Sequence, residues 1–109
     1  MSAATDRAYL GDVKLLPCEI CVQLGYCTSE PQTTAVSDAH HPRTGAGAAR
    51  KSPDADAIAL CDLHHRNGND ALHVMGRKAF ERRHGVTEGE LSRRTRARVQ
   101  QMRAMRVSR

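Results

Sequence analysis

The hydrophobic and polar positions in the middle of the chain predict two short strands. The segment that turns strand-like at Thr33 must end before Pro42, because proline lacks a backbone donor and keeps the preceding residue extended. A second apolar run covers residues 54–61, where Ile58 and Leu60 fall on one face of an extended chain. The second strand is expected to return beside the first, which predicts a two-stranded sheet.

Helices are predicted on the C-terminal side of these strands. The turn at residues 67–69 interrupts a helix that begins near Cys61, and its last asparagine can cap a new helix over about residues 70–83, ended by Gly85. Thr87 and Glu90 form a capping-box pattern that opens a further helix reaching about residue 106. The inward-facing stripes are Leu72, Met75 and Ala79 on the first helix, and Leu91, Thr95, Val99, Met102 and Met105 on the second.

The amino-acid composition predicts that the hydrophobic core alone gives this fold too little stability. The chain has 109 residues, which is the size of one domain, with no tryptophan, one phenylalanine and two tyrosines. Much of its apolar content is alanine, which buries little area per residue. Burial alone is expected to leave the domain marginally stable, and a structural metal is the obvious supplement.

Three cysteines and one histidine have the spacing of a closed zinc site. Cys18 and Cys21 form a Cys-x2-Cys knuckle, and Cys61 and His64 stand three residues apart, as ligands do on the first turn of a helix. Cys27 could replace one member of the first pair. The two-residue gap is the commoner ligand spacing, and it favours Cys18 and Cys21.

Two other uses of the cysteines are weighed against zinc. A redox dithiol usually opens a helix in a strand–helix–strand unit, and Pro17 and Gly25 give no such context. Disulfides need an oxidising compartment, yet the first seven residues contain no apolar signal-peptide core. No run approaches the roughly 20 apolar residues of a membrane span. A reduced, cytoplasmic chain without a membrane segment is therefore expected.

Two pairs of adjacent histidines form a second candidate site. His40 and His41 end the first predicted strand, where two neighbours can reach one site although their side chains alternate. His64 and His65 diverge by about 100° on a helix, so they serve different ions. His65 is then expected to form an open site with the first pair, and His73 is either an auxiliary ligand or a structural residue.

Charge is unevenly distributed along the chain. The net charge is +5, but residues 1–76 carry six Lys/Arg against nine Asp/Glu, whereas residues 77–109 carry eleven against three. The basic segment indicates a polyanionic partner, DNA above all, although a solubilising tail is the alternative. The loop at residues 43–53 either straddles a phosphate backbone or is simply solvated. The expected DNA contacts are Arg43, Arg50, Lys51, Arg93, Arg94, Arg96 and Arg98.

As a set, these motifs resemble a nuclease family. The predicted order of strand, loop, strand and helix, in which paired histidines end the first strand, is similar to the ββα-metal (His-Me finger) fold of HNH endonucleases. The resemblance implies an α+β fold in which this core carries a zinc knuckle and is followed by helices. More closely, the chain resembles phage-associated HNH proteins of the recombination-enhancement nuclease type. The motifs that carry this resemblance are, in order, Cys-x2-Cys, Ala-His-His, Lys-Ser-x-Asp, Leu-Cys-x2-His-His, Leu-His and Gly-Arg-Lys-Ala-Phe-Glu. The resemblance covers residues 17–86. Residues 1–16 are then an N-terminal extension and residues 87–109 a basic C-terminal helix or tail.

The resemblance implies a metal-dependent DNA endonuclease acting in the cytoplasm of a bacterium or a phage-infected host. It makes His41 the general base and puts Asp56, as the second catalytic residue, in the place of the family's middle asparagine, which helps to fix the loop and so the base. It assigns His40 and His65, with His73, to a catalytic divalent ion such as Mg²⁺ or a transition metal, beside the structural zinc. A protein partner or a homodimer stays open.

Two rival interpretations keep the same metal-stabilised fold. A catalytically inactive DNA-binding module explains the zinc and the charge, but not why His40, His41 and His65 are all retained. A structural or assembly protein, whose tail binds RNA or a partner, leaves the same histidines idle.

Overall fold

The computed structural model describes residues 6–42 and 52–107 and shows a small α+β domain built on a two-stranded sheet. Strands β1 (Asp38–His40) and β2 (Ile58–Leu60) pair antiparallel, with Ala39 opposite Ala59. This pairing confirms that the second strand returns beside the first. It also places Cys61, which follows β2, on the same side of the domain as the knuckle, since α2 packs against β2.

The first strand is shorter than the sequence predicts. Residues 33–37, expected to be extended, form bends and irregular chain. The reason is that the backbone amides of Val36 and Ser37 both donate to the carbonyl of Lys14, at 2.8 and 3.2 Å. These donors are satisfied by the N-terminal segment, so strand pairing begins only at Asp38.

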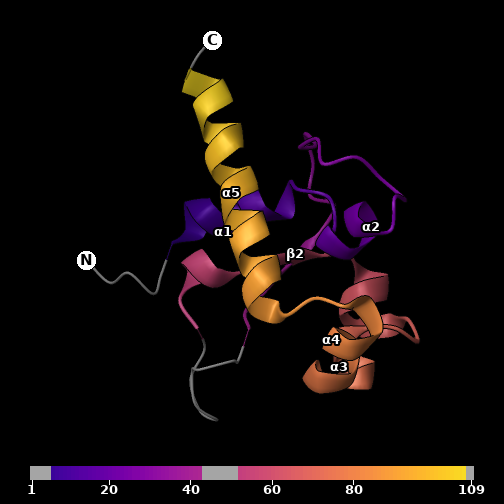
Figure 1. Cartoon of the computed structure of the whole chain (residues 1–109). Helices are drawn as coiled ribbons and strands as arrows, with labels where there is room; N and C mark the ends of the chain where they lie inside the picture. The colour runs from indigo at the N-terminus through magenta and orange to yellow at the C-terminus, as the bar shows by residue number, and fades with distance from the viewer. Residues whose placement is uncertain (1–5, 43–51, 108–109) are drawn as a thin grey trace.

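Helices surround the sheet, and α1 and α5 both pack on it. In Figure 1 the long helix α5 crosses α1, while α3 and α4 lie near the N-terminal end of α5. Among the described residues, no helix combines the length and the apolar character needed to cross a bilayer. The helical elements are α1 (Arg7–Lys14), α2 (Glu19–Gln23), the 3-10 turn η1 (Asp54–Asp56), the π-helical turn η2 (Leu63–Asn67), α3 (Leu72–Met75), α4 (Arg77–His84) and α5 (Glu88–Val107).

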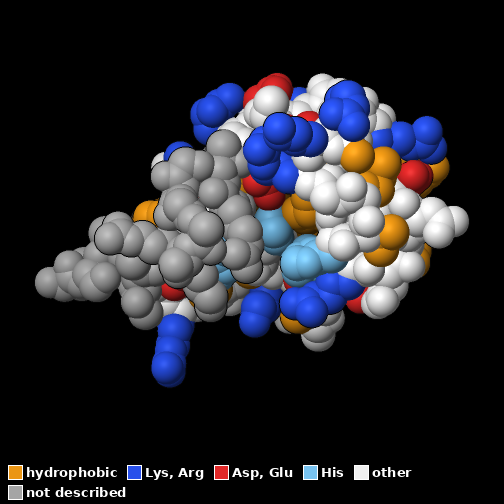
Figure 2. Space-filling model, turned by 90° about the horizontal axis from the view of Figure 1, so that it is seen from below, with side chains coloured by type: hydrophobic (Ala, Val, Ile, Leu, Met, Phe, Trp, Pro, Cys, Tyr) orange, Lys and Arg blue, Asp and Glu red, His pale blue; other side chains and the backbone are white. Residues whose placement is uncertain are grey.

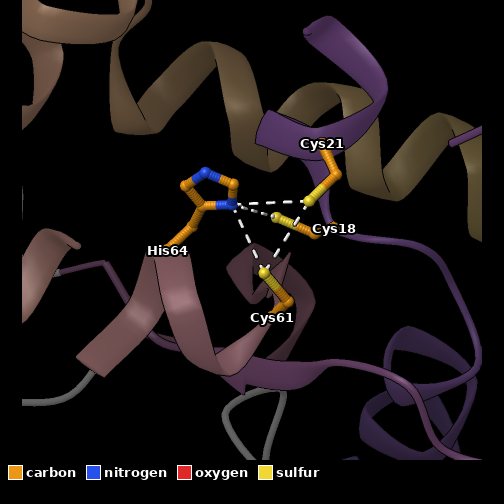
Figure 3. Close-up of side chains that lie close together, drawn as sticks. All are labelled: Cys18, Cys21, Cys61 and His64. Carbon is orange, nitrogen blue, oxygen red and sulfur yellow. Dashed lines mark hydrogen bonds between the residues drawn. The ribbon is translucent and has the colours of Figure 1, made fainter. Parts of the chain in front are cut away.

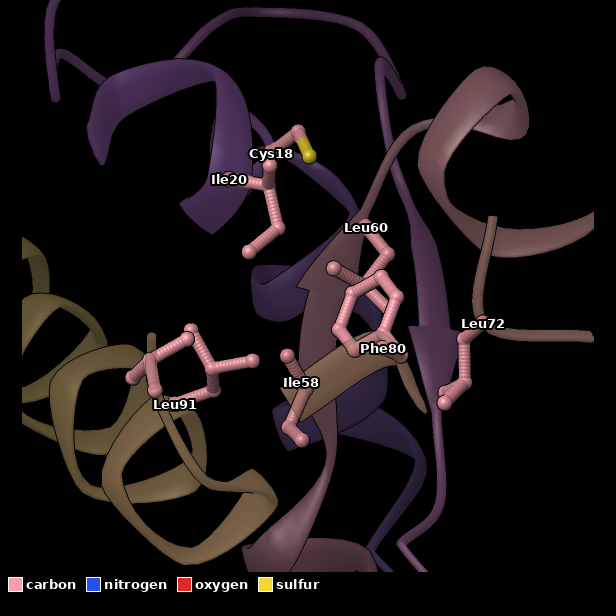
Figure 4. Packing of buried hydrophobic residues seen from close by; sticks show 8 residues of the cluster. Cys18, Ile20, Ile58, Leu60, Leu72, Phe80 and Leu91 are labelled. Atoms are coloured by element: carbon pink, nitrogen blue, oxygen red, sulfur yellow. The ribbon is translucent and has the colours of Figure 1, made fainter. Parts of the chain in front are cut away.

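Strand β2 is buried on both faces and separates two apolar clusters. Ile58 and Leu60 share one face, as their alternation predicts. Figure 4 shows the residues around them, which come from α2, α3, α4 and α5. This cluster consists of Cys18, Ile20, Ile58, Leu60, Leu72, Phe80, Val86 and Leu91, and the partly buried Cys21 and Cys61 pack against it.

The opposite face of β2 is covered by the two terminal helices. Ala57 and Ala59 leave room for them there, because alanine side chains are small. The described parts of the two segments that the resemblance leaves outside the family domain, residues 6–16 and 87–107, therefore both contribute to the core. The second cluster consists of Tyr9, Val13, Leu16, Ala57, Ala59, Val99 and Met102.

The beginning of α5 is the capping box expected from the sequence. The amide of Glu90 donates to Thr87 Oγ1 at 3.1 Å, and the amide of Thr87 donates to Glu90 Oε1 at 3.2 Å. Leu91, Thr95, Val99 and Met102 of the predicted stripe are buried, whereas Met105 is 57% exposed. The helix is thus packed firmly on the domain over most of its length.

The helix predicted over residues 70–83 is split in two. Gly76 adopts φ 85° and ψ 157°, which no helix accommodates, and it separates α3 from α4. The expected cap at Asn69 is also wrong, because α3 begins only after the extended residue Ala71. The break turns Phe80 of α4 into the core.

Candidate metal centres

Cys18, Cys21, Cys61 and His64 come together as the spacing predicts. Cys18 immediately precedes α2 and Cys21 lies within it, while Cys61 follows β2 and His64 lies in η2. Figure 3 shows the three sulfur atoms and the imidazole pointing at a common centre. Nδ1 of His64 lies 3.5, 3.4 and 3.3 Å from the Sγ atoms of Cys18, Cys21 and Cys61, and the Sγ atoms of Cys21 and Cys61 are 3.8 Å apart.

These separations match the edges of a zinc tetrahedron. Ligands at about 2.3 Å for sulfur and about 2.1 Å for nitrogen stand about 3.8 Å apart as a sulfur pair and about 3.6 Å apart as a mixed pair. The four residues could therefore hold a metal ion with every position filled by protein, and the donor set suits zinc. Cys27 is exposed and outside the group, and no disulfide links the four cysteines, all of which are described.

Two of the thiols, those of Cys18 and Cys21, lie where the ionised form is disfavoured in the absence of a cation. Burial raises the pKa of the Cys18 thiol to about 11. Burial, followed by the neighbouring Cys18 and Cys61 thiols, also raises the pKa of Cys21. Metal ligation requires the thiolate, so a bound cation supplies the charge that reverses these shifts. Burial lowers the pKa of His64, which keeps its imidazole in the neutral, ligating form.

His40, His65 and His73 form a second, separate group. Nδ1 of His40 lies 3.2 Å from Nε2 of His65, and Nε2 of His73 lies 3.1 Å from the same His65 atom. His40 ends β1, His65 lies in η2 and His73 lies in α3. The first two are buried and His73 is exposed. Three ligands with one exposed member make a site that is open to solvent.

Two carboxylates select which imidazole nitrogens face this centre. Nε2–H of the buried His40 donates to Glu88 Oε2 at 2.7 Å, and Nδ1–H of His65 donates to Asp38 Oδ2 at 2.9 Å. A carboxylate only accepts, so each of these nitrogens carries the proton and the other nitrogen of each ring carries a lone pair. Two lone pairs then face each other at 3.2 Å, an arrangement that a shared cation relieves.

His64 and His65 diverge within the π-helical turn η2. The amide of Gly68 donates to Leu63 O at 3.0 Å, and the amide of His65 donates to Cys61 O at 2.8 Å. A Cβ atom on Gly68 would lie 2.2 Å from the carbonyl oxygen of Leu63, so only glycine closes this turn. Adjacent histidines are thereby directed into two different groups, as predicted.

His41 lies outside both groups and is held by Asp54. Its Nε2–H donates to Asp54 Oδ1 at 2.7 Å. The resemblance pointed to Asp56 as the residue that fixes this histidine, but Asp56 instead pairs with Arg96 at 2.6 Å. The 3-10 turn explains the difference, because residues two apart on a helix with three residues per turn cannot share a side.

The carboxylates beside the histidines are the part of the site that sequence reasoning missed. Asp38 stands two residues before His40, a same-face spacing on a strand that was available as a signal. Glu88 gave no local signal, because it opens α5 and reaches His40 only through packing. Asp54 was overlooked in favour of Asp56.

The predicted DNA contacts on α5 are largely engaged with the domain itself. Arg98 pairs with the buried Glu19 at 2.9 Å, and Arg96 pairs with Asp56. Arg94 donates to the side chain of Gln23 at 2.9 Å, whereas Arg93 is exposed. The other predicted contacts, Arg43, Arg50 and Lys51, lie outside the described residues.

Other basic side chains lie on the segments that carry the histidines. Arg66 follows His65 in η2 and is exposed, and α4, next to the His73 helix, carries exposed Arg77, Lys78, Arg82 and Arg83. Figure 2 shows histidine side chains reaching one face of the molecule with Lys and Arg side chains around them. This face combines imidazole and positive charge.

Lowering the pH is expected to destabilise the fold through these histidines. Burial lowers the pKa of both His64 and His65 from 6.5, so the unfolded chain takes up protons first. The stability that their neutral forms contribute is complete above about pH 6.5 and is lost as the pH falls below it. Urea unfolding from about pH 7.5 to about pH 5.5 should show the decline, with a shallower slope for His65→Gln. A free energy of unfolding that stays constant over this range would contradict the expectation.

Comparisons with known proteins do not identify a function for this chain. No family model, curated protein or solved structure matches the chain. The described part of the chain forms a small α+β domain with two groups of side chains that could each hold a metal ion, one closed and one open.

Proposed function

We propose that this chain is a metal-dependent DNA endonuclease of the HNH type, with a ββα-metal core formed by β1, β2 and η2. The observation that supports it best is the division of the adjacent residues His64 and His65 between two groups. One group has four protein ligands and suits a structural zinc. The other has three imidazoles and is open, so an ion there keeps positions for a phosphate oxygen and water.

The donor set of the open group favours a transition metal. Three neutral imidazole nitrogens suit zinc, nickel and related ions, whereas Mg²⁺ prefers oxygen ligands. The nearby carboxylates of Asp38 and Glu88 hold the outer nitrogens of the ligands rather than the centre itself. A divalent ion bound there would stabilise the negative charge that develops on the scissile phosphate. The Mg²⁺ suggested by the resemblance is therefore the less suitable ion.

His41 is the proposed general base. It directly follows the ligand His40, so the two Cα atoms stand about 3.8 Å apart at the end of β1. Imidazole is the side chain best suited to take a proton from water near neutral pH. The hydrogen bond from its Nε2–H to Asp54 holds the ring in one orientation.

Positive charge near the histidines is the argument for a nucleic-acid substrate. The chain carries a net charge of +5, and exposed Lys and Arg side chains surround the histidines on one face (Figure 2). Such charges bind the phosphates of a nucleic acid whatever its base sequence. Nothing in the sequence encodes direct base readout, so cutting directed by the DNA backbone or by DNA structure is proposed rather than cutting directed by base sequence.

The test is cleavage of plasmid DNA by purified protein with Zn²⁺, Ni²⁺, Mn²⁺ or Mg²⁺. Wild type should nick or cut the plasmid, and His41→Ala should slow cutting by about 10²-fold or more, as expected for loss of a general base. His65→Ala should remove activity by removing a ligand. His84→Gln is the matched control, since His84 belongs to neither group, and it should cut like wild type.

Two outcomes would contradict the endonuclease proposal. Equal nicking by wild type and His41→Ala means contamination or a different base. Binding of the plasmid without cutting, with every ion and with zinc present in the purified protein, would favour the inactive DNA-binding module. Circular dichroism and zinc content verify that each variant is folded.

A further inference from the structure

We infer that Asp54 is the positioning residue of His41, and that the N-terminal segment of the chain holds Asp54 in place. This inference rests on the proposed function, in which His41 is the base. It assigns a role to two residues: Asp54, the aspartate of the Lys-Ser-x-Asp run, to which the resemblance gave no role, and Asp6, which lies outside the resemblance. It also gives the start of α1 a part in the site.

Both oxygens of the Asp54 carboxylate are engaged. Oδ1 accepts from His41 Nε2–H at 2.7 Å, and Oδ2 accepts from the backbone amide of Asp6 at 2.6 Å. The side chains of His41 and Asp54 are only 18% and 12% exposed. Charge-assisted hydrogen bonds shielded from water in this way are short and directional. The carboxylate is therefore fixed from two sides.

The anchor at Asp6 is itself well determined. The Asp6 side chain caps α1 by accepting from the amide of Tyr9 at 2.9 Å, while its backbone amide faces Asp54. Tyr9 in turn is buried in the cluster on the second face of β2. The position of Asp54 is thus coupled to the packing of α1.

The contact determines which nitrogen of His41 can act. A carboxylate cannot donate, so Nε2 carries the proton and Nδ1 carries the lone pair. In hydrolysis Nδ1 takes a proton from the attacking water, whose oxygen bonds to phosphorus as the bond to the leaving oxygen breaks. The leaving oxygen takes a proton from solvent, and the imidazolium formed beside Asp54 returns its proton to solvent.

The same arrangement, a carboxylate that accepts a hydrogen bond from an imidazole, recurs on the neighbouring histidines, which indicates that these contacts belong to one organised site. His40 is backed by Glu88 and His65 by Asp38, each on the nitrogen that points away from the metal centre. His41 with Asp54 makes a third imidazole oriented by a carboxylate. Such partners fix ring orientation, and their loss commonly costs 10- to 100-fold in activity or metal affinity.

The experiment compares single-turnover cleavage of DNA by wild type, Asp54→Ala and Asp54→Asn, the second variant being nearly isosteric. Both should cut about 10- to 100-fold more slowly, with unchanged DNA dissociation constant and zinc content. Glu30→Gln, which removes an exposed carboxylate on the loop between α2 and β1, is the matched control and should cut like wild type. In proton NMR spectra the slowly exchanging Hε2 of His41 should be present in wild type and lost in Asp54→Ala.

The outcomes separate this inference from the proposed function. If wild type cuts and both Asp54 variants cut equally fast, the positioning role is wrong and the endonuclease stands. If Asp56→Asn is slower than Asp54→Asn, the role belongs to Asp56 and the inference is overturned. If wild type cuts DNA with none of the ions although Hε2 is protected, the proposed function fails and the catalytic role of Asp54 fails with it. Should Asp54→Ala not fold, Asp54→Asn decides.

Discussion

Replacing Cys61 by serine is expected to unfold the domain. Cys61 connects the end of β2 to the knuckle, and its sulfur is one of four donors around the closed centre. Structural zinc contributes about 10 kcal/mol or more to small domains, which is comparable to the whole stability of a typical domain, about 5–15 kcal/mol. With one phenylalanine and no tryptophan in the chain, the apolar clusters are not expected to compensate. Circular dichroism melting with zinc analysis measures the effect.

Cys27→Ser is the matched control for this experiment. Cys27 is exposed and lies outside the closed group, so its variant should melt like wild type and keep its zinc. Treating wild type with a strong zinc chelator should reproduce the Cys61→Ser result. A purified wild-type protein without zinc, together with an unchanged melting temperature for Cys61→Ser, would refute the closed zinc site.

Replacing Arg98 by alanine is expected to destabilise the fold by about 3–5 kcal/mol, because it leaves a buried carboxylate without its charged partner. The Glu19 side chain is fully buried, and Arg98 Nε reaches both of its oxygens, at 3.1 and 2.9 Å. Thr95 Oγ1 donates to the same carboxylate at 3.2 Å. Since Glu19 follows Cys18, the pair ties α5 to the Cys-x2-Cys knuckle. Urea unfolding measures the loss.

A second pair on the surface provides the contrast. Arg77 and Glu81 form an i, i+4 pair on α4 in which Arg77 is largely exposed, so Arg77→Ala should cost no more than about 1 kcal/mol. The double variant Glu19→Gln with Arg98→Ala should lose less than the two single variants added together, since the buried charge is gone. An Arg98→Ala protein as stable as Arg77→Ala would show that the buried pair is unimportant.

Ion pairs between α5 and the rest of the domain change the interpretation of the uneven charge distribution along the chain. From the sequence, the basic segment at residues 77–109 suggested a tail directed at DNA. In the structure Arg98, Arg96 and Arg103 meet Glu19, Asp56 and Asp12 of the acidic part of the chain. Arg106 also pairs with Asp12. A large part of the charge asymmetry therefore serves to dock α5 on its own domain.

The sequence by itself determined the features that depend on local spacing. The Cys-x2-Cys knuckle, the Cys61 and His64 pair and the divergence of His65 follow from the geometry of a few consecutive residues. The capping box of α5 is equally local. In each case the chain itself limits how far apart the atoms can lie, so the spacing predicts the contact.

Only the tertiary structure decided which carboxylates stand behind the histidines. Glu88 is 48 residues from His40, and Asp38 is 27 residues from His65. Such contacts depend on how α5 and η2 pack on the sheet, and no spacing rule encodes that. Asp54 could be told from Asp56 only once the intervening turn was known to be 3-10. Local spacing thus identified most of the candidate metal ligands, whereas long-range packing brought them together, put His73 rather than His41 in the open group and specified the carboxylates that orient the imidazoles.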